Sequence, residues 1–332
     1  MAFLAKVRKS LFRRSLLYIH KMPGKISCSR VQKLMGNRFE ITVLADDEQS
    51  GQEAIDLAIA EVVRIENLLT TFKESSQVNQ INAQAGIKAV KVDKEVLELV
   101  QRALKISSLT QGAFDITYGS IDKRLWNFDL KMTALPDAKT ALESVKLINY
   151  KNVLVDVFQS TVMLKQEGMR IGFGGIGKGY AADRAMHILK STGMESGIVN
   201  AAGDLVTWGI QLNGEAWTIG IADPTQKTPA FSSLNISNMA IATSGNYEKY
   251  VFIDGKKYSH TIDPATGLPV SGIKSVSILC PSAELADALA TPVMVMGVKV
   301  GLDLINQMRQ VACIIIDDKD QMYTSKNINI KY

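Results

Sequence analysis

The chain of 332 residues is long enough for one large domain or two closely packed lobes, and its 46% hydrophobic and 21% charged residues are ordinary for a globular protein. The net charge of +5 is unevenly placed, because ten basic residues and no acidic one precede Glu40, which leaves 28 basic and 33 acidic residues in the rest. Such an acidic body argues against a nucleic-acid-binding protein, and no run approaches the roughly 18 apolar residues of a membrane-spanning helix.

The basic residues at the start define a segment of their own. Residues 1–33 are expected to form a flexible leader, and its basic residues could make weak contact with an anionic membrane surface. Residues 34–332 are expected to form the functional domain. Two arginines interrupt the apolar stretch 11–19, so the segment lacks the h-region of a secretory signal peptide. We therefore expect a location in the cytoplasm or at the cytoplasmic face of the membrane.

The first half of the chain shows clear periodicity. Alternating polar and apolar residues predict a strand over 38–44. Apolar residues at helical spacing predict the strongest helix over 52–70, and a second helix over 94–109. Two short apolar runs, 152–157 and 161–165, indicate a hairpin.

The second half begins with a glycine-rich loop and a helix predicted over 178–191, with Gly193 as its left-handed cap. Asp254-Gly255 is a strong hairpin signal between two of the later strands. The predicted strands are 197–200, 217–222, 239–243, 249–253, 257–262, 275–280 and 311–317, with helices near 283–290 and 300–308. Hairpins mixed with helices imply an α+β fold rather than a parallel α/β sheet.

The segment Gly174-Gly175-Ile176-Gly177-Lys178-Gly179 leads into the predicted helix, and its spacing is not that of a Walker A loop. Backbone N–H groups of such a loop can bind phosphate oxygens, with Lys178 as a point charge. An equally open alternative is a glycine-rich turn that only packs the start of the helix.

A second motif, Gly112-Ala113-Phe114-Asp115-Ile116-Thr117, follows the helix over 94–109. Asp115 could accept a hydrogen bond from a ring N–H or a ribose hydroxyl, with Trp126 and Phe128 forming an aromatic wall. The alternative needs no ligand, since a helix end capped by Gly112 and a packed Phe114 would explain most of the motif.

His260 is one of three histidines, and Asp263 and Thr266 follow it closely. A histidine can act as general acid or base near neutral pH, although a lone histidine at a strand end is more often structural. The residues Asp263-Pro264-Ala265-Thr266-Gly267 are typical of a turn.

Asp287 and Thr291 are spaced i, i+4 and therefore share one face of a helix. Two oxygen ligands so placed can hold Mg²⁺, whereas the alternative is an ordinary polar helix surface. Pro292 disfavours the helical conformation at Thr291, so we expect the helix to end or kink there.

Taken in this order, these segments resemble the FAD:protein FMN transferases, the ApbE family. The resemblance covers nearly the whole chain beyond the basic leader. Its segments are Met35-Gly36-Asn37-Arg38-Phe39-Glu40-Ile41, Gly112-Ala113-Phe114-Asp115-Ile116-Thr117, Gly174-Gly175-Ile176-Gly177-Lys178-Gly179-Tyr180-Ala181-Ala182-Asp183, Asn200-Ala201-Ala202-Gly203-Asp204, Ala242-Thr243-Ser244-Gly245, His260-Thr261-Ile262-Asp263-Pro264-Ala265-Thr266-Gly267 and Ala286-Asp287-Ala288-Leu289-Ala290-Thr291.

The resemblance implies an α+β, T-fold-like architecture with the active site in a cleft between two lobes. It implies Mg²⁺-dependent transfer of the FMN moiety of FAD to a Ser or Thr hydroxyl of a target flavoprotein, with release of AMP and no nucleic-acid partner. A pyrophosphatase that cleaves FAD to FMN and AMP, or a protein that binds FAD without turnover, stays open as an alternative.

By the same resemblance, the residues that would line FAD are Met35, Phe72, Ala113, Phe114, Asp115, Gly172, Lys178 and Thr261. The Gly175 carbonyl, Asp287 and Thr291 would hold the metal, and His260 would transfer a proton. Many members carry Asp-Leu where Gly172-Phe173 stands, so one FAD contact is lost or made by backbone here. Many members are also exported, which makes a periplasmic, membrane-anchored location the alternative to the cytoplasm.

Overall fold

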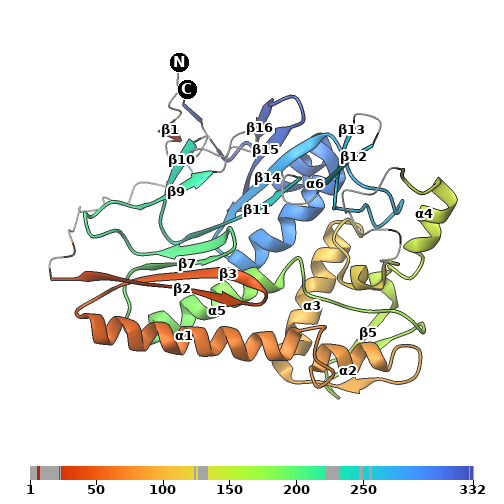
Figure 1. The fold of residues 1–332 in the computed structure, drawn as a ribbon, viewed down its shortest axis with the longest axis horizontal. Coiled ribbons are helices and arrows are strands. Elements are labelled where there is room, and N and C mark those ends of the chain that lie inside the picture. The colour runs from red at the N-terminus through yellow and green to blue at the C-terminus, as the bar shows by residue number, and fades with distance from the viewer. Residues whose placement is uncertain are drawn as a thin grey trace.

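The computed structural model describes residues 6–7, 22, 24–122, 125, 134–221, 232–246, 250–253, 256–328 and 330–331. Its centre is an eight-stranded sheet in which every neighbouring pair is antiparallel, with the strand order β16-β15-β14-β11-β8-β7-β3-β2 (Figure 1). The strands are β2 (Ile26–Leu34), β3 (Asn37–Ala45), β7 (Gly197–Ala201), β8 (Asp204–Trp208), β11 (Met239–Gly245), β14 (Ile273–Cys280), β15 (Ala312–Asp317) and β16 (Met322–Thr324).

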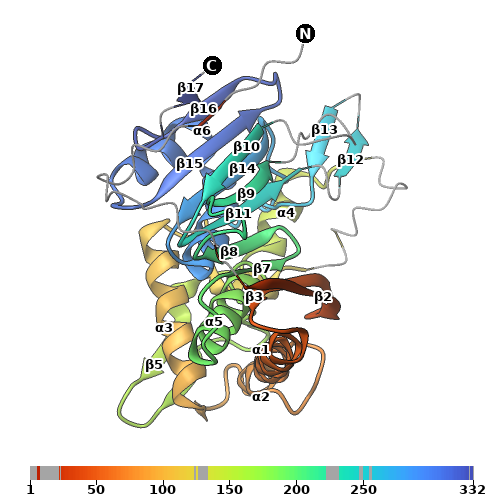
Figure 2. The same cartoon turned by 90° about the vertical axis from the view of Figure 1, so that its left-hand side faces the viewer.

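Three helices cover one face of this sheet (Figures 1 and 2). Helix α1 (Glu48–Leu69) packs on β2 and β3, α5 (Gly177–Ser191) on β7 and β8, and α6 (Ala283–Asn306) on β11, β14 and β15. The period-2 alternation of a strand explains the two faces. In β11, Ala240 and Ala242 point into the cores beneath the helices, while Met239 and Ile241 belong to the core on the opposite face.

A small four-stranded sheet packs on this opposite face and contributes apolar side chains to its core. Its order is β17-β1-β10-β9, formed by β17 (Ile330–Lys331), β1 (Lys6–Val7), β10 (Ser232–Ile236) and β9 (Trp217–Ile221). Leu234 and Ile236 of β10 and Ile219 of β9 are buried together with Leu205 and Ile314 of the large sheet. The strands β8, β11, β14 and β15 of the large sheet are therefore buried on both faces.

The remaining described elements lie on the right in Figure 1, from the C-terminal end of α1, which contacts α2, to the neighbourhood of α6. They are α2 (Gln77–Ala83), α3 (Lys94–Leu109), α4 (Ala138–Ser144), the 3₁₀ turns η1 (Ile116–Ser120) and η3 (Tyr150–Asn152), the sheet of β4 (Val90–Lys91), β6 (Thr161–Leu164) and β5 (Val153–Asp156), and the hairpin of β12 (Tyr250–Ile253) and β13 (Lys256–Ser259). Helix α3 also contacts α6 and η1, which links this part to the sheet.

The strands and helices expected from the sequence are present within the described residues, and the α+β class is confirmed. Helix α3 has the predicted limits, and the pairing of Ile253 with Lys256 confirms the hairpin whose turn residues, Asp254-Gly255, lie outside the described residues. Trp126 and Phe128 lie outside them as well.

Two expectations need correction. The helix over 283–290 does not end at Thr291, because α6 continues through the buried Pro292, and the first residue with non-helical φ and ψ is Gly297. Val293 and Met294 are buried in the core beyond the proline, and this packing holds the next helical turn in place. The expected leader, 1–33, overlaps β2, whose residues 26–33 pair along β3, while residues 8–21 lie outside the described residues.

Among the described helices, α6 is the one with the length and apolar composition to cross a membrane. In this fold it lies on the sheet and contributes Leu289, Val293 and Ile305 to a buried core, and the same helix carries Asp287 and Thr291.

Candidate active site at the start of helix α5

The glycine-rich loop closes directly onto the first turn of α5. The Ile176 and Gly177 N–H groups both donate to the Phe173 carbonyl, at 3.3 and 2.7 Å, and Ile176 provides no side-chain cap for the helix. Gly175 lies against the ring of Phe114, since a Cβ built on this glycine would be 3.5 Å from a ring carbon. The positive end of α5 is thus framed by glycine backbone and one aromatic ring, an arrangement that suits an anionic ligand.

The first turn of α5 also places Lys178 between two buried carboxylates. Its Nζ makes an ion pair with Asp204 and lies 3.4 Å from Oδ1 of Asp287, and both aspartates are almost fully buried. The neighbouring Gly179 donates its backbone N–H to Oδ2 of Asp287 at 3.0 Å. The glycine loop, Lys178 and the Asp287 carboxylate of α6, which the family resemblance assigned to one site, therefore lie together although 109 residues separate the lysine from the aspartate.

Burial and mutual repulsion set the electrostatics of this cluster. Burial, and then the negative charge of Asp287, raise the pKa of the Asp204 carboxyl to about 7, although the Lys178 ammonium acts against the shift. Burial alone would lower the pKa of Lys178, but the charges of Asp287 and Asp204 outweigh it and raise the pKa above its ordinary value. Lys178 consequently remains a cation throughout the neutral range, next to two carboxyl groups that depend on it.

Asp204 is a site residue that the sequence analysis did not single out. It is the first residue of β8 and pairs with Ala201 across a tight turn in which Ala202 and Gly203 have φ of 56° and 101°. Oδ1 of Asn200 accepts the Gly203 N–H at 2.8 Å and stabilises the turn. The residues Ala202-Gly203 between two apolar runs are the turn signal in the sequence that could have placed Asp204 at the start of a strand.

Thr291 lies one helical turn after Asp287, and the two residues share a face of α6 as expected. Its hydroxyl is 2.9 Å from the Ser244 hydroxyl of β11. Oxygen atoms from α6 and β11 therefore meet next to the lysine–carboxylate cluster. No group of three or more His, Cys, Asp or Glu suited to a metal occurs among the described residues, and the metal shell of Gly175, Asp287 and Thr291 stays a prediction.

Asp115 has a defined structural task. Its Oδ1 accepts the N–H of Thr117 at 2.8 Å and the Thr117 hydroxyl at 2.6 Å, while Oδ2 accepts the Tyr150 N–H at 2.9 Å. Burial raises the pKa of this carboxyl, against the effect of these hydrogen bonds. Asp115 thus fixes the loop that holds Ala113 and the buried Phe114 beside Gly175, and its contact with FAD stays a prediction.

Two of the other residues expected at FAD lie near the glycine loop. Met35, in the turn between β2 and β3, donates its N–H to Glu66 at 2.9 Å, and its Cε lies 3.7 Å from a Cβ built on Gly177. Phe72 follows α1 and is 95% exposed, so its ring is available for stacking. The preceding residue, Thr71, reaches Gly172 with its methyl group, which lies 3.8 Å from a Cβ built there.

His260 and Thr261 follow β13 and are held near η1. The Thr261 N–H donates to the buried Ser259 hydroxyl at 3.1 Å, and the next residue, Ile262, donates to the Tyr118 hydroxyl at 3.4 Å. Since Tyr118 belongs to η1, the chain after His260 is joined to the element that follows Phe114 and Asp115. The catalytic role of His260 and the flavin contact of Thr261 stay predictions.

The turn after His260 is confirmed. Oδ1 of Asp263 accepts the Ala265 N–H at 2.8 Å, and Oδ2 accepts the Thr266 hydroxyl at 3.1 Å. Gly267 has φ of 72°, and a Cβ there would lie 2.0 Å from the Ala141 carbonyl oxygen. This turn is therefore locked against α4 and requires glycine at its last position.

The fold and this cluster define a mixed α+β protein in which a glycine loop, a buried ammonium group and oxygen ligands meet at a helix start. Residues 35–315 match the model of the ApbE family. The chain is 31% identical over 299 residues to a FAD:protein FMN transferase of Klebsiella pneumoniae, covering 90% of this chain and 89% of the relative. It is 32% identical over 271 residues to one of Treponema pallidum, covering 76% and 74%.

A solved structure agrees with the sequence relatives. The crystal structure of the ApbE protein of Thermotoga maritima superimposes with a TM-score of 0.81 at 31% sequence identity, covering 91% of this chain and 97% of that one. The chain belongs to the ApbE family.

Proposed function

We propose that this chain transfers the FMN moiety of FAD to a Ser or Thr hydroxyl of a target flavoprotein and releases AMP, with Mg²⁺ as cofactor. The observation that carries the proposal is the meeting of Lys178, Asp204 and Asp287 at the glycine-framed start of α5. The names of the Klebsiella and Treponema relatives, FAD:protein FMN transferase, support the same reaction.

In this reaction the acceptor oxygen forms a bond to the phosphorus of the FMN moiety, and the bond from that phosphorus to the bridging oxygen breaks. The bridging oxygen leaves with AMP, and the hydroxyl proton passes to a base, so FAD and the hydroxyl give the flavinylated protein and AMP. Phosphoryl transfer of this kind depends mainly on positioning and charge compensation. Lys178 and the positive end of α5 are proposed to supply the charge compensation, and His260 is the residue proposed to accept the proton.

The donor set proposed for Mg²⁺ consists of the Gly175 carbonyl, the Asp287 carboxylate and the Thr291 hydroxyl, which are all hard oxygen ligands. The structure fits a cation here, because Asp287 is 6% exposed and already has an ammonium group 3.4 Å from one oxygen. Bound Mg²⁺ would polarise a phosphoryl oxygen and balance the charge that develops on the leaving AMP.

The flavin nucleotide is proposed to lie along the elements that surround the glycine loop. Phe114, which follows Ala113, lies against Gly175, Met35 borders the first turn of α5, and the exposed Phe72 offers a ring face. Gly172 presents only backbone where relatives carry a longer side chain. Thr261 follows the proposed base and would contact the FMN part.

The test combines purified chain, FAD, MgCl₂ and a candidate flavoprotein acceptor, with covalent flavin read as fluorescence on a denaturing gel and AMP read by chromatography. We expect equal amounts of AMP and protein-bound flavin, and none of either with an acceptor whose target Ser or Thr is changed to Ala. AMP and FMN without any protein-bound flavin would instead show a pyrophosphatase. FAD binding without AMP formation, across several acceptors, would refute transfer and leave a binding protein.

A further inference from the structure

The N-terminus of α6 is capped by a carboxylate that comes from another helix. The two oxygens of Asp183, in α5, accept the N–H groups of Ala283 and Glu284 at 2.9 and 3.0 Å. One of them also accepts the Ser282 hydroxyl at 2.8 Å, and Ser282 in turn accepts the Leu285 N–H at 3.2 Å. All three first-turn N–H groups of α6 are thereby satisfied, two of them by α5.

This cap lies one helical turn away from the proposed metal ligand. Gly179 and Asp183 are spaced i, i+4 on α5, and Ala283 and Asp287 are spaced i, i+4 on α6, so each pair shares a helix face. The two helices touch at the glycine, where a Cβ would lie 2.1 Å from the Ala283 carbonyl oxygen. The same glycine donates its N–H to Oδ2 of Asp287, one turn further along α6, at 3.0 Å.

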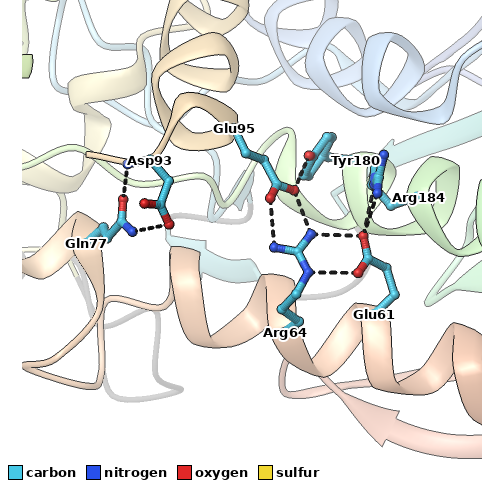
Figure 3. A network of polar contacts seen from close by, with 7 residues as sticks. All are labelled: Glu61, Arg64, Gln77, Asp93, Glu95, Tyr180 and Arg184. Carbon is cyan, nitrogen blue, oxygen red and sulfur yellow. Dashed lines mark hydrogen bonds and ion pairs between the residues drawn. The ribbon is translucent and has the colours of Figure 1, made fainter. Parts of the chain in front are cut away.

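Helix α5 is itself fixed from its other side. Tyr180 donates its hydroxyl to Glu95 of α3, and Arg184 contacts Glu61 of α1 at 2.9 Å (Figure 3). Arg64 joins the two acids, at 2.7 Å from Glu95 and 2.8 Å from Glu61, so that charges of opposite sign alternate between the helices. Helix α5 is thus anchored to α1 and α3, and through Asp183 it holds the start of α6, whose body packs on the sheet.

A further ion pair supports α6 without reaching Asp287. Arg102 of α3 binds Glu284 through Nε and Nη2, at 2.6 and 3.1 Å, and its guanidinium lies 5.6 Å from the ring centre of Tyr180. This pair holds the side chain of Glu284, whereas the backbone N–H groups of Ala283 and Glu284 depend on Asp183.

We propose that Asp183 is a positioning residue: by capping α6 from α5, it sets the place of the Asp287 carboxylate relative to Lys178 and the Gly179 amide. Only the expected effect on Mg²⁺ affinity rests on the function proposed above; the positioning of Asp287 does not. Residues that orient a metal ligand typically change metal affinity by about 10–100-fold when altered. Asp183 touches neither substrate nor metal in this scheme and acts through the helix that it caps.

The test compares Asp183→Asn with Ser282→Ala, a control that removes the cap on Leu285 and the hydroxyl bond to Asp183 but leaves the Asp183 bonds to Ala283 and Glu284. Both variants should lower the Tm. The first readout is hydrogen exchange of the Gly179 amide in metal-free protein, which reports whether its bond to Asp287 is formed. We expect exchange to rise about tenfold or more in Asp183→Asn, and the calorimetric affinity for Mg²⁺ alone to fall about tenfold or more, with changes under about threefold in Ser282→Ala.

Wild-type exchange at Gly179 in Asp183→Asn, or equal changes in the two variants, would overturn the proposal. If the Asn variant does not fold, Asp183→Glu carries the same test, since it keeps the charge but lengthens the side chain, and unchanged Gly179 exchange there would also overturn it. Failure of the wild-type chain to bind Mg²⁺ would remove the proposed cofactor, while the metal-free exchange rates would still decide the role of Asp183.

Discussion

Replacing Lys178 by Met removes the one cation shown to contact the buried Asp204 and Asp287 carboxylates within the described residues. The change keeps the length and the apolar stem of the side chain, so the packing is nearly preserved. Breaking a buried ion pair by removing one partner typically costs about 3–5 kcal/mol, because the remaining charges stay buried without compensation. We expect a loss of this size in the free energy of unfolding at about pH 8.5, in the absence of divalent cations.

The loss should shrink as the pH falls. Folding raises the pKa of Asp204 from its ordinary value of 3.8 to about 7. Between these two pH values the carboxyl is protonated in the folded chain and ionised in the unfolded chain. Stability from this group therefore falls as the pH rises through that window, by up to about 1.4 kcal/mol per pH unit. Without Lys178 the pKa of Asp204 rises further, and the protonated carboxyl removes most of the repulsion with Asp287 at about pH 5.5.

The assay is urea unfolding followed by tryptophan fluorescence at both pH values, with Lys274→Met as the matched control. Lys274 has a similarly buried side chain, 20% exposed, but its partner Asp320 is 59% exposed, so the control should lose less than about 1 kcal/mol at either pH. A Lys178→Met protein that loses no more than the control at the higher pH, or loses equally at both, would refute this account of the cluster.

Three further substitutions test single contacts. Gly179→Ala places a methyl group 2.1 Å from the Ala283 carbonyl oxygen. We expect the free energy of unfolding in urea to fall by about 1–3 kcal/mol or more and flavin transfer to be lost. A fully stable, active variant would show that α5 and α6 are not in close contact. Thr291→Val keeps the side-chain shape but removes the proposed metal ligand, so the Mg²⁺ concentration for half-maximal AMP release should rise about tenfold, and an unchanged value would exclude the hydroxyl from the metal shell. Gly267→Ala should destabilise the chain by more than about 1 kcal/mol, because Gly267 has φ of 72° and a Cβ there would lie 2.0 Å from an α4 carbonyl oxygen. Gly174→Ala, whose Cβ would have nothing within 4 Å, should leave the unfolding midpoint unchanged. Similar midpoints for the two variants would contradict the turn geometry.

Local signals in the sequence were sufficient for most elements. The apolar spacing along α1 and α3 is strong, and both helices were predicted, yet α1 begins before the predicted residue 52. The reason is that Asp47 caps it, through a carboxylate that accepts the Ser50 N–H at 2.8 Å. The strand β2 was missed because most of its side chains are exposed, which removes the alternation of a half-buried strand.

The site was harder to predict in detail, because its contacts join residues far apart in the chain. The family resemblance assigned Lys178 and Asp287 to one site but not their ion pair, and Asp204 requires the β7–β8 turn and its place in the sheet. Asp115 could be a ligand or a loop residue by sequence alone. Its bond to the Tyr150 N–H, 35 residues away, shows the structural task that no local pattern contains.

The decisive test of FMN transfer at the Asp287 site measures the AMP and protein-bound flavin formed from FAD, with Mg²⁺ and an acceptor present. It compares the wild-type chain with Asp287→Asn. Asp156→Asn makes the same change at an exposed aspartate of β5 and serves as the matched control. We expect both products to fall about 10²-fold or more in Asp287→Asn and to be unchanged in Asp156→Asn. Wild-type rates in Asp287→Asn would contradict it.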